Sequence, residues 1–466
     1  MRSVSLSTGQ QLTRDDLRRE GALPREVMEA AEGIVRAVRE GGDRAVRDFC
    51  LKFDGACPDS FRVDGSVIAD ALGMVDPEFR EALRRAAAQI REFHEREREQ
   101  SWFTTRADGT VLGVKVTPVA SAALYVPGGR AQYPSTVLMG SIPAKVAGVE
   151  RVIMVTPPQR DGSLSAYTLA AAAVAGVDEV YAVGGAQAIA AVAYGTQSIP
   201  AVEKIVGPGN AYVAAAKRCV SGDVGIDMVA GPSEVCVLAD ASADPAIVAA
   251  DLMAQAEHDP MATCYLVTCD ADLPQRVLDA VGLLVAQSPR EGITRTSLAE
   301  RGLVVCCATL GDAIDAVNVI APEHLELHCQ DAFSLLGRVR NAGAIFVGAW
   351  SSEPLGDYVA GPNHTLPTGG TARFSNPLGV YDFTKRSSVI GYSPEGLAVD
   401  GPAVQAMAQA EGLWAHALSV GMRRKLLAEG GEKFADPAAA CADAMATAWP
   451  RRLSEPGVPR PSGGPA

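Results

Sequence analysis

The chain has 466 residues, of which 48% are hydrophobic and 21% are charged. This balance is typical of a folded protein with two or three domains, and it excludes wholesale disorder, collagen-like repeats and a small disulfide-stabilised fold. Because 55 acidic side chains outnumber 42 basic ones, for a formal net charge of -13, nucleic acid is not expected as a partner.

The N-terminal stretch 1–19 carries charges at Arg2 and at five positions from Arg14 to Arg19, and it lacks the continuous apolar segment of a secretory signal peptide. The alanine-rich stretches are interrupted within about 10–12 residues, which is too short to cross a bilayer. The ten cysteines form no Cys-x-x-Cys pair, and several lie in apolar runs such as Leu303–Cys307. We therefore expect reduced thiols, a cytoplasmic location and no membrane partner.

Helical periodicity marks the first hundred residues. Apolar side chains recur every three to four residues in 25–39 and again in 76–99, the spacing of amphipathic helices. The second stretch ends in the charged run His94–Glu99, which is typical of a solvated helix end with its own opposite-charge pairs. His94 is therefore predicted to lie at the surface.

From about residue 120, short apolar segments alternate with alanine-rich helical stretches. The predicted strands are Ala122–Val126, Arg151–Val155, Glu179–Val183, Lys204–Val206, Glu234–Leu238, Thr263–Thr268, Leu303–Ala308 and Ala344–Val347. Repeated β-α-β units form parallel sheets covered by helices. Two such arrays predict an α/β protein with two Rossmann-like parallel-sheet domains and smaller N- and C-terminal helical segments.

The predicted domain boundaries follow these changes of pattern. They are an N-terminal helical segment over 1–24, a first Rossmann-like domain over 25–124 and 234–378, a second over 125–233, a C-terminal helical segment over 379–450, and a flexible tail over 451–466. The tail is rich in Pro, Gly and Ser and has no periodicity.

Glycine-rich turns follow several predicted strands, at 127–129, 184–185, 207–209 and 231–232. In open α/β sheets, ligands bind beyond these carboxyl ends. The dinucleotide fingerprint G-x-G-x-x-G is absent, because Tyr212 stands where a third glycine would fall. The turn at 207–210 can be purely structural or can bind a phosphate at a helix N-terminus. Any dinucleotide must be held in a non-standard way.

Four of the six histidines have polar or acidic neighbours near predicted strand or helix ends: His258, His324, His364 and His416. Gln255 and His258 share a helix face, and Glu323 precedes His324. Imidazole with amide or carboxylate oxygen can bind Zn²⁺, and paired acid and imidazole groups can also move protons. With Asp357, these residues predict an active site that is either a metal site or an acid–base site. His328, in an amphipathic stretch, is interpreted like His94.

The glycine turns and histidines lie in motifs that resemble those of the histidinol dehydrogenase family. The matching segments are 125–129 (YVPGG), 183–190 (VGGAQAIA), 206–210 (VGPGN), 226–234 (IDMVAGPSE), 255–260 (QAEHDP), 321–326 (APEHLE), 356–358 (GDY), 361–364 (GPNH) and 411–413 (EGL) with His416. The resemblance runs from about residue 25 to 430 in family order. Departures are Arg130, Gly140-Ser141 and the long C-terminal extension, of which the first two leave the detail of the cofactor loop open.

The resemblance implies the oxidation of L-histidinol to L-histidine through L-histidinaldehyde, a four-electron reaction with two NAD that ends histidine biosynthesis. It implies one Zn²⁺ per subunit, held by Gln255, His258, Asp357 and His416. His324 is implied as the base for alcohol oxidation, and Glu323 as the group that activates the water attacking the aldehyde.

Further site residues follow from the same resemblance. The implied substrate contacts are Ser233, Gln255, His258, His324, Asp357, Glu411 and His416, with His364 as a neighbour. The implied NAD contacts are Tyr125, Gln187 and Asn210. Zinc and substrate would belong to the first Rossmann-like domain and NAD to the second. The family forms a domain-swapped homodimer with shared active sites, in which the C-terminal segment carries His416 to the other subunit.

Three other functions are open. A paralogue that oxidises another diol, such as sulfopropanediol, would need extra basic residues near Glu411 for a sulfonate, and none adjoins it. A catalytically inactive zinc- or nucleotide-binding protein would be expected if an acid–base residue were replaced, and none is. A zinc hydrolase could use Glu257 beside His258, but two Rossmann-like arrays would then lack a purpose.

Overall fold

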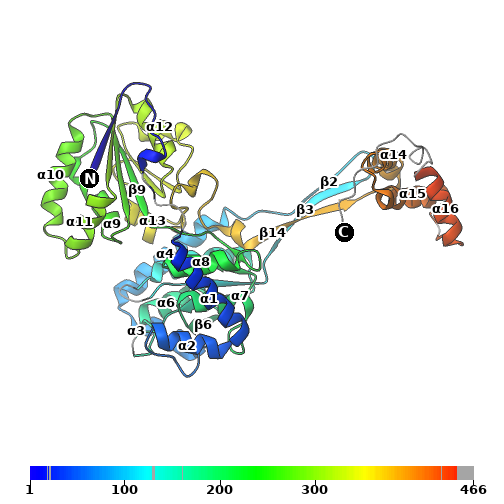
Figure 1. Ribbon diagram of the computed structural model, residues 1–466, viewed down its shortest axis with the longest axis horizontal. Helices are drawn as coiled ribbons and strands as arrows, with labels where there is room; N and C mark the ends of the chain where they lie inside the picture. The colour runs from blue at the N-terminus through cyan, green and yellow to red at the C-terminus, as the bar shows by residue number, and fades with distance from the viewer. Residues whose placement is uncertain (18, 20–22, 129–131, 160, 432, 449–466) are drawn as a thin grey trace. The chain divides into compact units, whose positions relative to one another are not determined.

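The computed structural model describes residues 1–17, 19, 23–128, 132–159, 161–431 and 433–448 (Figure 1). The chain forms two compact units. The first joins residues 1–98 to 118–384, and the second joins 99–117 to the chain from 385 onward. The predicted tail lies outside the described residues, as do Gly129 and Arg130. Among the described helices, none combines the length and apolar character needed to cross a membrane.

A parallel six-stranded sheet forms one core of the first unit. Its order is β1 (Arg2–Leu6), β11 (Leu303–Cys307), β10 (Thr263–Thr268), β9 (Glu234–Ala239), β12 (His324–His328) and β13 (Ala344–Val347). The almost complete burial of β9 and β10 explains their nearly continuous apolar sequences. One face is covered by α9 (Pro245–Ala256), α10 (Leu273–Val285) and α11 (Glu291–Glu300), and the other by α12 (Leu310–Ile320).

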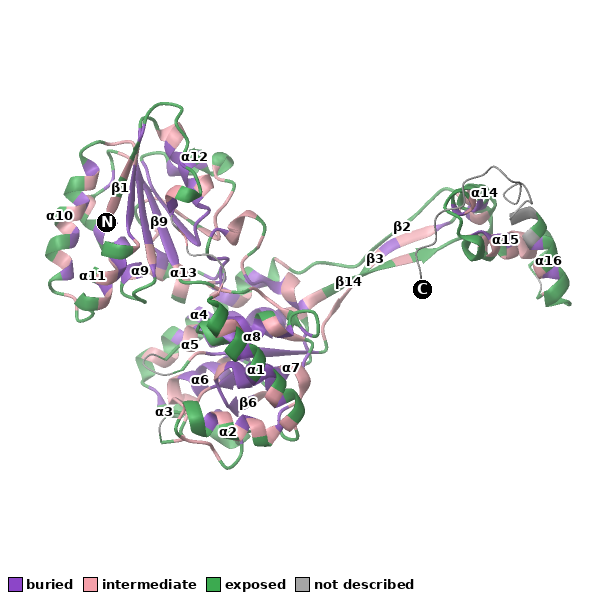
Figure 2. Ribbon diagram, in the orientation of Figure 1, coloured by how far each residue is buried: buried purple, intermediate pink, exposed green. Residues whose placement is uncertain are grey.

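A parallel five-stranded sheet forms the other core of this unit. Its order is β6 (Glu179–Ala182), β5 (Arg151–Thr156), β4 (Ser121–Tyr125), β7 (Lys204–Val206) and β8 (Gly225–Ile226). One face packs against α1 (Arg25–Gly41), α2 (Asp43–Phe53), α7 (Gly185–Tyr194) and α8 (Ala211–Val220). The other face packs against α3 (Gly65–Met74), α4 (Pro77–Glu95), α5 (Pro134–Ala147) and α6 (Ala166–Ala175). Figure 2 shows strands of both sheets buried beneath helices with exposed outer faces.

The two parallel sheets confirm the predicted α/β class. All eight predicted strands are present, with ends displaced by one residue at most. Short helices complete the unit: η1 (Asp15–Leu17), η2 (Ala332–Arg338), α13 (Glu353–Tyr358), η3 (Thr371–Arg373) and η4 (Val380–Phe383).

The N-terminal segment differs from the predicted helical one. Arg2–Leu6 forms an edge strand paired in parallel with β11, and the described helical element before residue 25 is the three-residue turn η1. Pairing with an existing sheet edge decides the conformation of so short a segment, and a local pattern cannot show it.

The structure also groups residues 25–124 differently from the prediction, which joined them to 234–378. Strand β4 belongs to the five-stranded sheet, and helices α1–α4 pack against this sheet. Ile34 is buried on one of its faces, and Ile90 on the other. Amphipathic periodicity predicts that a helix buries one face, but it does not say against which sheet.

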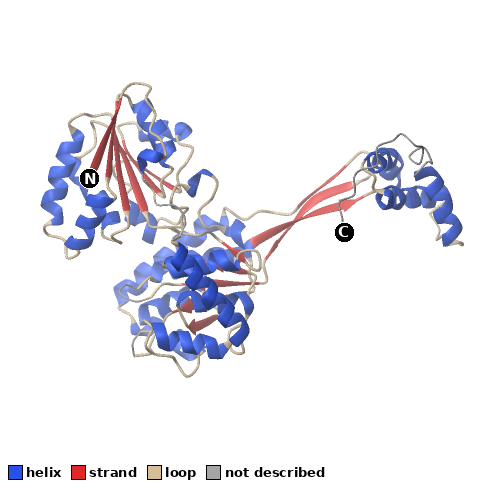
Figure 3. Cartoon of the chain, in the orientation of Figure 1, coloured by secondary structure: helices blue, strands red, loops and turns tan. Residues whose placement is uncertain are grey.

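An antiparallel sheet, which the sequence analysis missed, lies largely in the second unit (Figure 3). Its order is β14 (Thr384–Gly391), β3 (Val111–Pro118) and β2 (Trp102–Thr105). The same unit contains α14 (Pro394–Ala410), α15 (Trp414–Ala428) and α16 (Pro437–Ala448). The segment 379–450, predicted as helical, therefore also contains a strand, and its last two residues lie outside the described ranges.

Candidate active site

Strand β12 presents a row of polar side chains on one face of the six-stranded sheet. Alternate residues of a strand point to opposite faces, so His324, Glu326 and His328 share one face. Leu325 and Leu327 pack on the other face, in the core that includes α12. The polar row therefore lies on the face that α9 covers.

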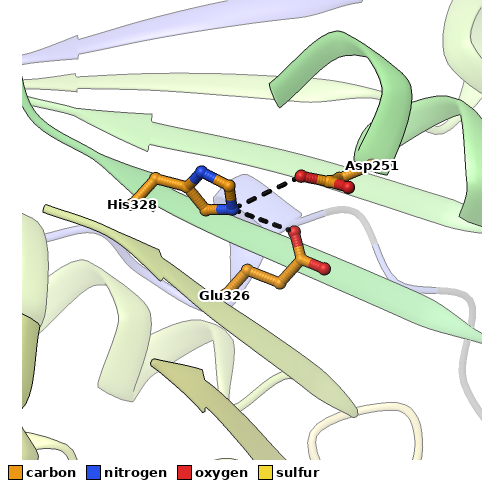
Figure 4. Close-up of side chains that lie close together, drawn as sticks. All are labelled: Asp251, Glu326 and His328. Carbon is orange, nitrogen blue, oxygen red and sulfur yellow. Dashed lines mark ion pairs between the residues drawn. The ribbon is translucent and has the colours of Figure 1, made fainter. Parts of the chain in front are cut away.

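Both histidines predicted to lie at the surface are instead buried. His94 follows Ile90 by four residues and so lies on the inner face of α4, where its Nδ1 is 2.7 Å from Glu97 Oε2. His328 ends the buried strand β12. Charged neighbours, such as those around His94 and Glu326 near His328 (Figure 4), suggested that both histidines are exposed to solvent. Burial is decided instead by the face of the helix or strand on which each histidine lies.

Helix α9 ends at Ala256, beside the predicted metal ligands. The amide of His258 donates to the carbonyl oxygen of Gln255 at 3.2 Å. The Gln255 side chain is buried, and its Oε1 has no hydrogen-bond partner among the described residues. A buried amide oxygen without a partner costs free energy unless a ligand binds it. Gln255 therefore fits a role in metal binding.

Helix α13 supplies two carboxylates, Glu353 and Asp357, one turn apart on one helix face. One ring nitrogen of His258 and one carboxylate oxygen from each of these residues lie within 4.8 Å of one another. Imidazole nitrogen and carboxylate oxygen are zinc donors. The structure thus brings together two predicted ligands, His258 and Asp357. It adds Glu353, which the sequence analysis missed although its spacing from Asp357 was a usable signal.

Glu353 is almost fully buried and lies close to Asp357, and both facts affect its pKa. Burial, followed by the neighbouring charge of Asp357, raises the pKa of Glu353 to about 9. A carboxyl group with this pKa keeps its proton at neutral pH.

His324 is buried and held in one orientation. Its Nδ1 lies 3.1 Å from the carbonyl oxygen of Glu234, which can only accept, so Nδ1 is the protonated nitrogen. Its Nε2 has no hydrogen-bond partner among the described residues and lies 3.9 Å from Asp357 Oδ1 and 4.0 Å from Glu353 Oε1. Burial lowers the pKa of His324, against the raising effect of Asp357. The free Nε2 can therefore accept a proton at neutral pH.

Glu323 lies next to His324 and is also buried. Its Oε2 accepts a hydrogen bond from the Glu234 amide at 2.8 Å, which fixes the carboxyl group. Burial raises the pKa of Glu323 well above its usual range, although the amide hydrogen bond favours the ionised form. A raised pKa makes this carboxylate, once ionised, a stronger base than an exposed glutamate.

A cavity of about 510 Å³ opens beside His324, Asp357 and His364. The Nδ1 of His364 donates to the backbone carbonyl of Asp357 at 3.0 Å, and its Nε2 lies 3.4 Å from Thr136 Oγ1. Phe346 forms part of the apolar wall. The cavity can accept a small ligand with polar groups at one end.

The predicted NAD contacts lie around the carboxyl ends of strands in the five-stranded sheet. Tyr125 ends β4, and its hydroxyl accepts from the Gly185 amide at 3.0 Å; burial raises the pKa of this phenol to about 12. Gln187 is buried in α7, and its Nε2 has no partner among the described residues. Asn210 caps α8, because its Oδ1 accepts from the amides of the second and third residues after it.

The strand order of the five-stranded sheet reverses near these residues. Chain order runs outward from β4 to β5 and β6 on one side and from β7 to β8 on the other, so a switch point lies between β4 and β7. Ligands of open α/β sheets bind at such points. Gly207, with φ 107°, directly follows β7 there, and a Cβ at this residue would collide with the Tyr125 carbonyl oxygen. The backbone approach therefore requires glycine.

The remaining predicted residues are placed as follows. Ser233 is half-buried before β9, and its carbonyl accepts from the Thr263 amide at 3.0 Å. Glu411 follows α14, and His416 lies in the first turn of α15, both exposed in the second unit. Their joining the cluster of the first unit stays a prediction.

Comparison with known proteins identifies the family. The family model described as histidinol dehydrogenase matches residues 17–424. The chain belongs to the histidinol dehydrogenase family. Histidinol dehydrogenase of Halalkalibacterium halodurans is 50% identical over 394 residues, which cover 84% of this chain and 93% of the relative. That of Bacillus subtilis is 49% identical over 404 residues, covering 87% and 95%.

A solved structure of the histidinol dehydrogenase family has the same fold. The crystal structure of histidinol dehydrogenase from Elizabethkingia anophelis matches with a TM-score of 0.86 at 33% identity, covering 92% of this chain and 98% of that one. The resemblance drawn from the sequence motifs is confirmed, and so is the oxidoreductase class that it implied. The domain-swapped dimer stays a prediction.

Proposed function

We propose that the chain catalyses the zinc- and NAD-dependent oxidation of L-histidinol to L-histidine through L-histidinaldehyde, with two NAD reduced. The observation that carries the proposal is the position of His324. In a member of the histidinol dehydrogenase family, this buried base has its free Nε2 3.9 Å from Asp357, within a group of side chains suited to hold zinc.

The zinc would be held by Gln255, His258 and Asp357, with His416 contributed by the other subunit of a homodimer that shares its active sites. Bound there, zinc supplies an anchor for the imidazole and amino nitrogens of the substrate, which orients the reacting carbon. The orphaned Oε1 of Gln255 and the convergence of His258 and Asp357 support this assignment.

His324 accepts the alcohol proton at Nε2. Because Nδ1 donates a hydrogen bond to the Glu234 carbonyl oxygen, the His324 ring is held in one orientation. The imidazolium that forms is stabilised by the nearby Asp357 carboxylate. The hydride leaves for NAD, which Tyr125, Gln187 and Asn210 would hold at the switch point. Glu323 takes a proton from the water that adds to the aldehyde, and a second hydride transfer yields the carboxylate. Glu411 and Ser233 would make the remaining contacts with the substrate, and His364 would lie next to it.

The proposal is tested by reaction stoichiometry. Purified protein supplied with zinc, NAD and L-histidinol should form close to two NADH per histidinol consumed, with histidine as product. One NADH per substrate, or turnover of sulfopropanediol alone, would reject the proposal.

A further inference from the structure

A buried ion pair lies beside the glycine turn that follows β7. It joins Lys217 of α8 to Asp227, the residue after β8, and the two side chains are only 3% and 1% exposed. Removing two charges from water costs free energy that their mutual attraction often does not recover, so stability alone does not explain such a pair. Neither residue has a role in the function proposed above.

Both charged side chains bind the main chain of Gly207. The Gly207 amide donates to Asp227 Oδ2 at 2.8 Å, and Lys217 Nζ donates to the Gly207 carbonyl oxygen at 2.9 Å. Asp227 is itself held, because its Oδ1 accepts from the Met228 amide at 2.6 Å. Hydrogen bonds to charged groups are stronger than those between neutral groups. The ion pair therefore fixes both polar main-chain groups of Gly207.

The turn fixed in this way is the one at which NAD is proposed to bind. It runs from Gly207 to Asn210, which caps α8 at the other end of the turn. A Cβ at Gly207 would collide with the carbonyl oxygen of Tyr125, another proposed NAD contact. A shift of Gly207 would therefore displace the turn relative to Tyr125.

We propose that Lys217 and Asp227 are positioning residues for NAD, which hold the turn 207–210 in its binding conformation before the cofactor binds. The inference rests on the proposed function, because it takes this turn to be part of the NAD site. When only a fraction of the protein has the binding conformation, the apparent Kd rises by the inverse of that fraction. The ion pair would thus act on the affinity for NAD and not on the chemistry at His324 and Glu323.

The NAD affinity of paired variants tests this inference. Removing one charge would leave the other buried and unpaired, so both partners are replaced together. Lys217→Met with Asp227→Leu removes the side-chain hydrogen bonds to Gly207, and we expect the Kd for NAD, measured by titration calorimetry, to rise about tenfold. The KM for NAD should rise with it, while kcat at saturating NAD stays close to the wild-type value.

A conservative pair and a control pair complete the experiment. Lys217→Gln with Asp227→Asn keeps a donor and an acceptor without the charges, so its Kd should lie closer to that of the wild type. The control pair lies at the amino ends of strands in the same sheet, where Lys145 Nζ is 2.5 Å from Asp178 Oδ2 and the Val152 amide donates to the same oxygen at 2.7 Å. Lys145→Met with Asp178→Leu should leave the Kd for NAD unchanged.

An unchanged Kd in Lys217→Met with Asp227→Leu, or an equal rise in the control pair, would overturn the inference while the proposed function stands. A wild type that binds no NAD would instead reject the proposed function, and this inference with it. If Lys217→Met with Asp227→Leu does not fold, hydrogen exchange of the wild type provides the second measurement. A Gly207 amide that is protected equally with and without NAD supports the inference, and one that is protected only with NAD overturns it.

Discussion

At the scale of single residues, neighbouring Glu323 and His324 are assigned to different half-reactions. Replacing His324 with Gln should lower histidinol oxidation by about 10²–10⁴-fold, the usual effect of losing a general base, while added histidinaldehyde is still oxidised. Glu323→Gln should do the reverse, because it removes the group that takes a proton from water. NADH formation from each substrate, measured separately, checks both outcomes. Equal losses on both substrates in either variant would contradict the division of roles.

The pH profile provides the control for this pair. Glu323 acts as a base only when ionised, and burial raises its pKa. The rate of aldehyde oxidation should therefore increase as the pH rises through the pKa of Glu323, and it should decrease as the pH falls below that pKa. In Glu323→Gln the residual rate should lose this dependence, since the amide does not titrate in this range.

The sequence was most informative about site residues that lie close together in the chain, within one short motif. Glu323-His324 and Gln255-Ala256-Glu257-His258 could be recognised because short motifs determine them. Glu353 could not be recognised as easily, because its importance depends on α13 lying against His258, a contact between segments about 95 residues apart in the chain. His94 and His328 were misplaced because neighbouring charges say less about burial than the face of the helix or strand.

At the scale of elements, Asn210 has two separable roles at the start of α8. Its Oδ1 caps the helix, and its amide nitrogen is the group left for NAD. Asn210→Ala should lower the free energy of unfolding by about 0.5–2 kcal/mol through loss of the cap. Asn210→Ser keeps a cap but removes the amide. Urea unfolding should place the Ser variant close to the wild type and the Ala variant below it.

Both variants should raise the KM for NAD, because both remove the amide nitrogen. A Ser variant with unchanged KM would show that Asn210 serves the helix alone. A KM that rises only in the Ala variant would mean that the cap, through the position of α8, is what NAD binding requires.

Elements with a clear period were predictable, and those defined by pairing were not. Parallel strands such as β4, β5 and β9 are buried apolar runs, so their positions followed from the sequence. The two-residue β8 and the buried β12, which has polar residues at alternate positions, were not predicted. Strand β1 is an edge strand of only five residues. Strands β2 and β3 pair with each other, and the residues of β2 are exposed while most of those of β3 are only half-buried. With little burial there is little hydrophobic pattern to read, although Val111–Pro118 has the β-branched residues of a strand.

At the scale of the whole molecule, the proposed active site needs residues from both compact units. Asp357 belongs to the first unit and His416 to the second. The family resemblance implies that they meet across a dimer, each site taking the first unit of one subunit and the second unit of the other. No pattern within one chain can decide this, because the same residues are present whether the site forms within a subunit or between two.

Mixing two inactive variants distinguishes these arrangements. Asp357→Asn and His416→Ala should each be inactive as pure homodimers. In a mixed dimer with shared sites, one site combines both substitutions and the other has neither, so one of two sites is restored. With random pairing, half of the dimers are mixed, and activity should return to roughly a quarter of the wild-type value. If each subunit instead used its own His416, every site would keep one substitution and the mixture would stay inactive. The two variants must be unfolded and refolded together so that subunits exchange, with each variant refolded alone as the control.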